Sequence, residues 1–150
     1  WNRHVLDDIS DENYYFKDEQ TLFLMDVDGF KNLNDTHGHN VGDKILIKVS
    51  QALKKAARET DYVIRYGGDE FLLLLKGANV DIQTVYVRIT QALHADFQKY
   101  GVTLSIGTYH ATKDNLSIHT ATKYADQALY HSKNNGKNQI TEYEKLTLDS

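Results

Sequence analysis

Hydrophobic and polar residues gather in blocks along the chain, and the first strong block is an apolar run over residues 21–27. A run of this length with almost no polar interruption predicts a central strand that is buried on both faces. The preceding residues, 4–18, are polar with scattered apolar positions and predict a frayed helix. Acidic residues stand at the end of this strand, where Asp26 and Asp28 precede Gly29.

Apolar residues over 41–58 recur at every fourth position, which predicts an amphipathic helix. These positions are Val41, Ile45, Val49 and Leu53. One or two helices are therefore expected between the first strand and the next. Another helix is expected from about 80 to 100, and a last one over 118–135. The last helix is expected to end at Gly136, since Asn-Gly is typical of a helix C-cap.

Two β-prone runs, 62–66 and 71–75, flank a Gly-Gly pair. This pattern predicts a β-hairpin, on the argument that tight hairpin turns need positive φ angles. Further strands are expected over 102–109 and, at an edge, over 139–143. Helices thus alternate with a mixed central sheet. The predicted fold is an α/β sandwich of the ferredoxin-like, palm-type kind, with the hairpin in its middle.

The length of 150 residues fits one domain, residues 1–150, and the abrupt start at Trp1, without an initiator Met, suggests a segment of a longer protein. The net charge of −4 argues against wide contact with nucleic acid or an anionic membrane, but a small phosphate ligand needs only a few local cations. The absence of cysteine excludes disulfides and thiolate sites and agrees with a cytoplasmic setting. No apolar run approaches the ~18 residues of a membrane-spanning helix.

Three carboxylates are expected to converge if the first strand and the hairpin are neighbours in one sheet, namely Asp26, Asp69 and Glu70. Such a cluster repels itself unless a cation lies in it, and oxygen ligands suit Mg²⁺, with Mn²⁺ as a substitute. The alternative is purely structural. Asp26 and Asp28 would then cap the following helix, and Asp69 and Glu70 would only occupy a turn.

Lys31 falls in the first turn of the helix that follows the acidic strand end. Free backbone N–H groups and the positive end of the helix dipole favour phosphate there, and a bound Mg²⁺ would complete a cradle for a triphosphate. The alternative is an ordinary solvated lysine. The sequence contains no calcium-binding loop, phosphate-binding P-loop or dinucleotide fingerprint.

Residues 65–71 read Arg-Tyr-Gly-Gly-Asp-Glu-Phe and contain the intact signature Gly-Gly-Asp-Glu-Phe. Four further blocks, 26–35, 38–43, 104–107 and 125–138, occur in matching order, so nearly the whole chain resembles the diguanylate cyclase, or GGDEF-domain, family. The resemblance implies one such domain cut from a longer sensory protein. It also implies condensation of two GTP molecules into cyclic di-GMP, with loss of pyrophosphate, between two copies of the domain that meet as a transient homodimer.

The resemblance implies roles for the acidic strand end. Asp26, Asp69 and the carbonyl group of Val27 would bind the metal. Either Asp69 or Glu70 would accept the proton of the attacking 3′-hydroxyl in a metal-assisted phosphoryl transfer. Lys31 would stabilise the phosphate in the transition state.

Other matching positions concern the nucleotide. Asn34 and Asp43 would recognise the guanine edge, which an amide and a carboxylate can both do. Lys133 and Lys137 would contact phosphates, although the family usually has arginine at the second position, and lysine lacks its bidentate fork. His39 matches a common family histidine, and a polar residue at a helix start is an equal alternative.

Arg58 and Asp61 match the family's inhibitory Arg-x-x-Asp motif, which binds the product cyclic di-GMP; the alternative is a surface salt bridge. A competing function is a receptor module that binds cyclic di-GMP or GTP and signals to a partner. The intact acids favour the enzyme over this receptor. A palm domain acting on nucleic acid is disfavoured by the net charge of −4.

Overall fold

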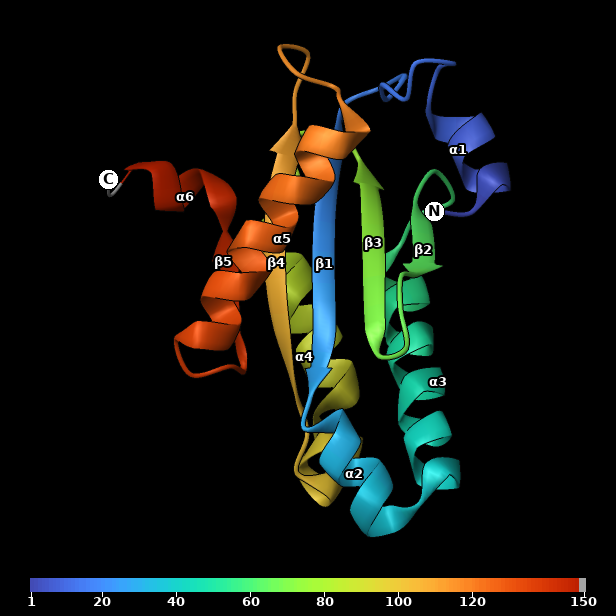
Figure 1. Ribbon diagram of the computed structural model, residues 1–150, viewed down its shortest axis with the longest axis vertical. Helices are drawn as coiled ribbons and strands as arrows, with labels where there is room; N and C mark the ends of the chain where they lie inside the picture. Colours follow the sequence, from blue (N-terminus) through green and yellow to red (C-terminus); the bar gives the residue numbers. More distant parts are fainter. Residues whose placement is uncertain (149–150) are drawn as a thin grey trace.

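The structure, a computed structural model, describes residues 1–148 and the side chains of residues 1–146. One five-stranded sheet, in the order β2-β3-β1-β4-β5, is covered by helices on both faces (Figure 1). In chain order, the elements are α1 Arg3–Ile9, β1 Gln20–Asp28, α2 Phe30–His37, α3 His39–Ala56, β2 Tyr62–Arg65, β3 Glu70–Lys76, α4 Ile82–Tyr100, β4 Thr103–Ala111, α5 Ile118–Asn134, β5 Gln139–Glu142 and α6 Tyr143–Leu148.

The central strand β1 pairs antiparallel with both β3 and β4. The hairpin strands β2 and β3 are antiparallel, whereas β5 runs parallel to β4 at the edge. The sheet is therefore mixed, and the predicted α/β sandwich, hairpin and closing edge strand are confirmed.

Side chains along β1 alternate between the two faces of the sheet. Phe23, Met25 and Val27 pack against α3 and α4, while Leu22 and Leu24 pack against α5 on the opposite face (Figure 1). All five are buried. The unbroken apolar run thus follows from burial on both faces, as the sequence predicts.

Close contact between α5 and the sheet depends on Gly107 in β4. A Cβ atom there would lie 2.1 Å from the backbone nitrogen of Leu129 and 2.4 Å from the carbonyl oxygen of Ala125. Only a residue without a side chain lets the helix backbone come this near. The C-terminal half of α5 is thereby held against β4, beside the end of β1.

The N-terminal helix is shorter than the predicted 4–18, because α1 ends at Ile9. Ser10 is already extended, and the carboxylate of Asp11 then accepts hydrogen bonds from the backbone nitrogens of Asn13 and Tyr15. This local side-chain bonding offers the backbone an alternative to further helix. The helix α6 is not predicted by any pattern in the sequence.

The hairpin is present, but the reason expected for its glycines is wrong. Neither Gly67 nor Gly68 has a positive φ angle. Four residues, 66–69, connect the strands, and the carbonyl of Glu70 accepts from the backbone nitrogens of Tyr66 and Gly67. A connection this long does not need the mirror-image turn of a two-residue loop.

Between β1 and β2 the chain forms two helices, which Gly38 separates with a φ of 88°. Arg58 lies beyond the second of these, not inside it as the predicted range 41–58 had it, because Ala57 is extended. Among the described residues no helix is long and apolar enough to cross a membrane.

Candidate active site

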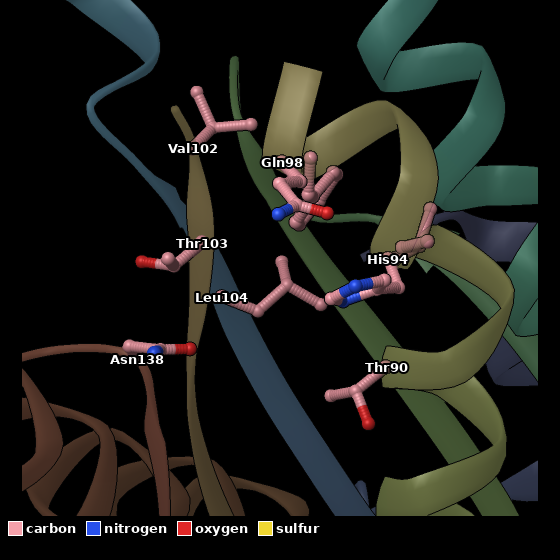
Figure 2. A pocket seen from close by; sticks show the side chains of 9 residues that line it. Thr90, His94, Gln98, Val102, Thr103, Leu104 and Asn138 are labelled. Atoms are coloured by element: carbon pink, nitrogen blue, oxygen red, sulfur yellow. The ribbon is translucent and has the colours of Figure 1, made fainter. Parts of the chain in front are cut away.

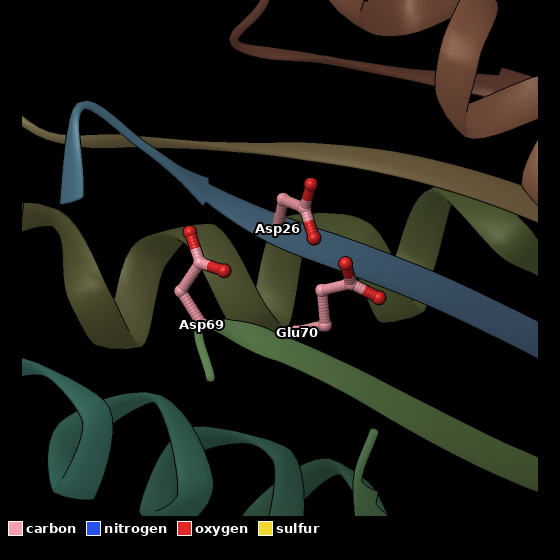
Figure 3. A group of neighbouring side chains, drawn as sticks. All are labelled: Asp26, Asp69 and Glu70. Atoms are coloured by element: carbon pink, nitrogen blue, oxygen red, sulfur yellow. The ribbon is translucent and has the colours of Figure 1, made fainter. Parts of the chain in front are cut away.

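The expected convergence of carboxylates occurs where β1 and β3 lie side by side. Asp26 and Glu70 are paired across the two strands, and Asp69 precedes Glu70 at the start of β3. One oxygen from each of the three side chains lies within 4.8 Å of the others. Figure 3 shows the three carboxylates gathered on one side of these strand ends.

Burial and charge make this cluster unusual. Asp26 is only 6% exposed, and its Oδ1 has no hydrogen-bond partner within the described part of the chain. Burial raises the pKa of Glu70, and the nearby charges of Asp69 and Asp126 raise it further. A divalent cation with a preference for oxygen would satisfy the unpartnered oxygen and offset the repulsion. The donor set therefore fits Mg²⁺.

Lysines surround the acids. Lys133 of α5 forms an ion pair with Asp26, and burial, together with Lys137, lowers the pKa of Lys133. Lys31, Lys133, Lys137, Asp26 and Asp69 line one hollow of about 480 Å³ at the end of β1. The structure thus brings the three expected phosphate contacts together with two of the expected metal ligands.

Val27 also lines this hollow, and its backbone nitrogen donates to the carbonyl of Asp69 across 3.2 Å. The hydrogen bond ties the end of the hairpin connection to β1. The capping alternative for the strand-end acids is wrong, because α2 has Gly29 as its N-cap and makes no side-chain capping bond. Asp28 instead accepts hydrogen bonds from β4 and from Asn138.

The two residues expected at guanine lie elsewhere, at the junction of α2 and α3. The Oδ1 of Asn34 is buried and has no hydrogen-bond partner among the described residues. Gly42 of α3 lies against it, since a Cβ there would be only 1.8 Å from this oxygen. Asp43 follows and lines a separate hollow of about 580 Å³. His39 is exposed as the first residue of α3.

Gly42 and Arg65 also contribute to the site, although no motif in the sequence assigns either a role of its own. Gly42 was matched only as part of a block, although a glycine inside an amphipathic helix is a signal of close packing. Arg65 donates to the carbonyl oxygens of Gly67, at 3.3 Å, and of Gly68, at 2.6 Å. Arg65 therefore holds the connection that leads to Asp69.

Arg58 and Asp61 form an ion pair at the opposite end of β3. The Nε of Arg58 lies 2.9 Å from Asp61 Oδ2, and its Nη2 donates to the carbonyl of Lys76 across 2.8 Å. The hydrogen bond to Asp61 raises the pKa of Arg58. Although burial opposes it, hydrogen bonds from Arg58 and the backbone of Lys76 lower the pKa of Asp61.

A salt bridge is therefore present, as the structural alternative expected, but only its Arg58 side lies at the surface, because the Asp61 side chain is 0% exposed. Beside it lies a hollow of about 280 Å³ that is lined by Arg58 and also by Arg88 of α4. Sequence reasoning gave Arg88 no role, because nothing local to it resembles a motif. Binding of the product at this hollow stays a prediction.

Comparisons with known proteins agree with this geometry. The family model described as "Diguanylate cyclase, GGDEF domain" matches residues 1–139. Diguanylate cyclase A of Treponema denticola is 37% identical over 131 residues, which cover 83% of this chain and 35% of the relative. Diguanylate cyclase DosC of Escherichia coli strain K12 is 40% identical over 131 residues, which cover 80% of this chain and 27% of the relative. The chain spans about a third of the length of these relatives.

Solved structures share the fold. The GGDEF domain of DgcB from Caulobacter crescentus, in complex with c-di-GMP, superimposes with a TM-score of 0.74 and 29% identity. The match covers 84% of this chain and 78% of that one. Diguanylate cyclase SiaD from Pseudomonas aeruginosa, in complex with its activator SiaC, gives 0.77 and 31% identity over 93% of this chain and 57% of that one.

Proposed function

Because the chain belongs to the diguanylate cyclase GGDEF domain family, we propose that it condenses two molecules of GTP into cyclic di-GMP and releases two molecules of pyrophosphate. The observation that carries the proposal is the convergence of Asp26, Asp69 and Glu70 within 4.8 Å, beside a hollow that is also lined by lysines. Polyphosphate chemistry needs both carboxylates for a divalent cation and cations for the phosphates.

Asp26 and Asp69, with the carbonyl of Val27, would hold a divalent cation, for which Mg²⁺ is the first candidate and Mn²⁺ the second. When bound, the cation supplies Lewis-acid stabilisation of the phosphate oxygens. Lys31, placed in the first turn of α2, would bind phosphate oxygens together with the uncapped backbone N–H groups of that turn.

In the reaction, the 3′-hydroxyl of one GTP attacks the α-phosphorus of the other. The O–H bond breaks and its proton passes to Asp69 or Glu70, while the bond from the α-phosphorus to the bridging oxygen breaks and pyrophosphate leaves. Lys133 and Lys137 would neutralise charge on the phosphates in this step. Repeating the transfer in the opposite direction closes the ring.

The guanine base would be recognised at the junction of α2 and α3. Asn34 offers a buried acceptor that has no partner among the described residues, and the exposed carboxylate of Asp43 would accept hydrogen bonds from N–H groups of the guanine edge. A hydrogen-bonding site of this kind discriminates strongly against bases that lack the matching groups.

One domain supplies one set of these groups, so two copies would face each other, each carrying one GTP. The homodimer need only form during turnover. The hollow beside Arg58 and Arg88 would bind the phosphates of cyclic di-GMP as a feedback site away from the metal ligands. With GTP as its substrate, the domain would act in the cytoplasm.

The test is incubation of the purified protein with GTP and Mg²⁺, with detection of cyclic di-GMP and pyrophosphate. Asp69→Asn serves as the control that should form neither. A protein that binds cyclic di-GMP or GTP but forms no product even with Mn²⁺ would be the receptor module instead. The intact acidic cluster supports the enzyme over this second candidate.

A further inference from the structure

Asp28 ends β1 two residues after Asp26, but it makes a different set of contacts. Its Oδ2 accepts from Thr103 Oγ1 at 2.7 Å, and its Oδ1 accepts from Ser105 Oγ at 2.7 Å. The same Oδ2 also accepts from the backbone nitrogen of Asn138 at 3.2 Å. The carboxylate is therefore a junction of β1, β4 and the segment that follows α5.

The negative charge of Asp28 is unfavourable for binding of phosphate nearby. Asp28 lines the same hollow as Lys31 and Lys137, where a negative charge repels a polyphosphate. Asn would fill nearly the same space without that charge. Three donors hold this carboxylate, and a charged acceptor binds them more strongly than a neutral amide would. The charge therefore serves to hold these donors in place.

The backbone at residues 137 and 138 needs such support. Lys137 and Asn138 have φ angles of 59° and 50°, a left-handed conformation that side-chain-bearing residues adopt at a cost in free energy. The nitrogen of Lys137 donates to the carbonyl of Ser132, and Gln139 Nε2 donates to the carbonyl of Lys137. Within the described chain, the hydrogen bond shown for the nitrogen of Asn138 is the one to Asp28.

A groove lies on the opposite side of this turn. Thr103 and Asn138 both line a groove of about 250 Å³ between α4 and β4, and Figure 2 shows the Leu104 side chain reaching across it toward His94, while the Thr103 side chain points away from α4. Asp28 therefore supplies the one hydrogen bond that ties the described turn at Asn138 to β1, beside the phosphate hollow.

We infer that Asp28 is a positioning residue, which fixes Lys137 at the phosphate side of the GTP site by holding the Asn138 amide. This inference rests on the proposed function, since it takes Lys137 as a phosphate contact. The side chain of Asp28 is assigned neither to the metal nor to the phosphates. It acts through the conformation of the turn.

The test is a double-mutant cycle with Asp28→Asn and Lys137→Ala. The ligand is 3′-deoxy-GTP, which lacks the attacking hydroxyl and reports binding alone. Each single change should raise the Kd for this nucleotide about tenfold, the effect of one charge-assisted hydrogen bond. The double variant should bind as Lys137→Ala does, and not about a hundredfold more weakly, because both changes remove one interaction.

A matched control is Asp35→Asn, which removes the same charge from an exposed residue of the same hollow. It should leave the Kd unchanged or lower it, whereas Asp28→Asn should raise it. A gentler variant, Thr103→Val, removes one donor to Asp28 Oδ2 and should raise the Kd about threefold. It keeps the inference testable if Asp28→Asn does not fold.

Hydrogen exchange gives a readout that is independent of the nucleotide. The Asn138 amide should lose protection in Asp28→Asn, while the amides between β1 and β4 keep theirs. Wild-type protection and Kd in Asp28→Asn, with weak binding in Lys137→Ala, would overturn the inference and leave the proposed function intact. Full additivity in the cycle would also overturn it. If the wild-type protein does not bind the nucleotide, the proposed function and the inference both fail.

Discussion

Asp26 and Glu70 are direct partners in the antiparallel pairing of β1 with β3, so two carboxyl groups lie across from each other in the sheet. Like charges at such positions destabilise a sheet. The register is nevertheless set by the apolar residues before them, Leu22–Met25, which pair with Phe71–Leu74. The core thus forces the acids together, and a bound cation would relieve their repulsion.

The first prediction concerns Asp69. Asp69→Asn should abolish cyclisation of GTP, because it removes a metal-binding charge from the partly exposed start of the hairpin strand. The fold should survive. The thermal midpoint of the wild-type protein should rise when Mg²⁺ is added, and that of Asp69→Asn should rise less, since binding to the folded state alone stabilises it.

Calorimetry with and without Mg²⁺, combined with a product assay, measures both effects. Asp35→Asn, which changes the same charge outside the cluster, should keep the metal-dependent rise. A folded Asp69→Asn protein that cyclises GTP at the wild-type rate would contradict the assignment of Asp69.

Gly42 is the second test position. A Cβ atom there would overlap Asn34 Oδ1, at 1.8 Å. Gly42→Ala should therefore displace the Asn34 side chain and raise the Kd for GTP about tenfold, since a guanine contact is lost. The Kd for ATP, which lacks the guanine edge, should change little.

Isothermal titration with the two nucleotides checks this selectivity. Lys48→Ala on the exposed face of the same helix is the control and should leave both affinities unchanged. Equal loss of affinity for GTP and ATP in Gly42→Ala would point to a general distortion and against a guanine contact at Asn34.

Gly107 tests the packing of α5. An added Cβ would approach backbone atoms of Leu129 and Ala125, which cannot rotate away as a side chain would. Gly107→Ala should lower the free energy of unfolding by about 1–3 kcal/mol, the usual cost of overpacking. Urea denaturation measures it, with Gly68→Ala as the control, because a Cβ at Gly68 has open space around it. Similar midpoints for the two variants would count against the tight contact.

Local apolar patterns were enough to predict the sheet and most helices. The continuous run in β1 and the four-residue steps in α3 each describe one element and its buried faces. The acidic cluster was also predictable, because Asp26 lies at a strand end and Asp69 at a hairpin, and only their adjacency had to be assumed. The structure supplies that adjacency.

What escaped prediction depends on contacts between distant residues. Asp28 and Asn138 are 110 positions apart, and no local pattern indicates that one holds the other. The same holds for Arg88, which reaches the hollow beside Arg58 only because α4 packs near the end of α3. The end of α1 was misjudged for a local reason, since Asp11 bonds to the backbone after it.

Assembly gives a fourth prediction. If each domain binds one of the two GTP molecules that react, the specific activity should rise with protein concentration and level off once dimers form. Activity is measured over a dilution series of at least a hundredfold, with a dimeric coiled coil fused upstream of Trp1 as the control. The fusion should be more active than the unfused chain at low concentration. Constant specific activity over the series would contradict a shared active site.

The last prediction concerns feedback at Arg58 and Arg88. Arg58 is tied to Asp61 and to the carbonyl of Lys76, so Arg58→Ala also disturbs the end of β3. Arg88 lines the same hollow without an ion pair shown within the described chain, so Arg88→Ala removes a cation and leaves that end intact. Each variant should weaken binding of cyclic di-GMP by about one to two decades, as expected for loss of charge-assisted contacts.

Neither substitution lies at the acidic cluster of Asp26, Asp69 and Glu70. Initial rates of GTP cyclisation should therefore stay near the wild-type value, while product accumulates to a higher plateau. Lys145→Ala, which removes an exposed lysine paired with Glu142 of β5, is the matched control and should keep wild-type sensitivity to added cyclic di-GMP. The comparison of Arg58→Ala with Arg88→Ala separates two causes. If only Arg58→Ala loses inhibition, the ion pair with Asp61 carries the effect through the end of β3. If both variants keep wild-type inhibition, the Arg58–Asp61 pair is a structural salt bridge and this hollow does not bind the product.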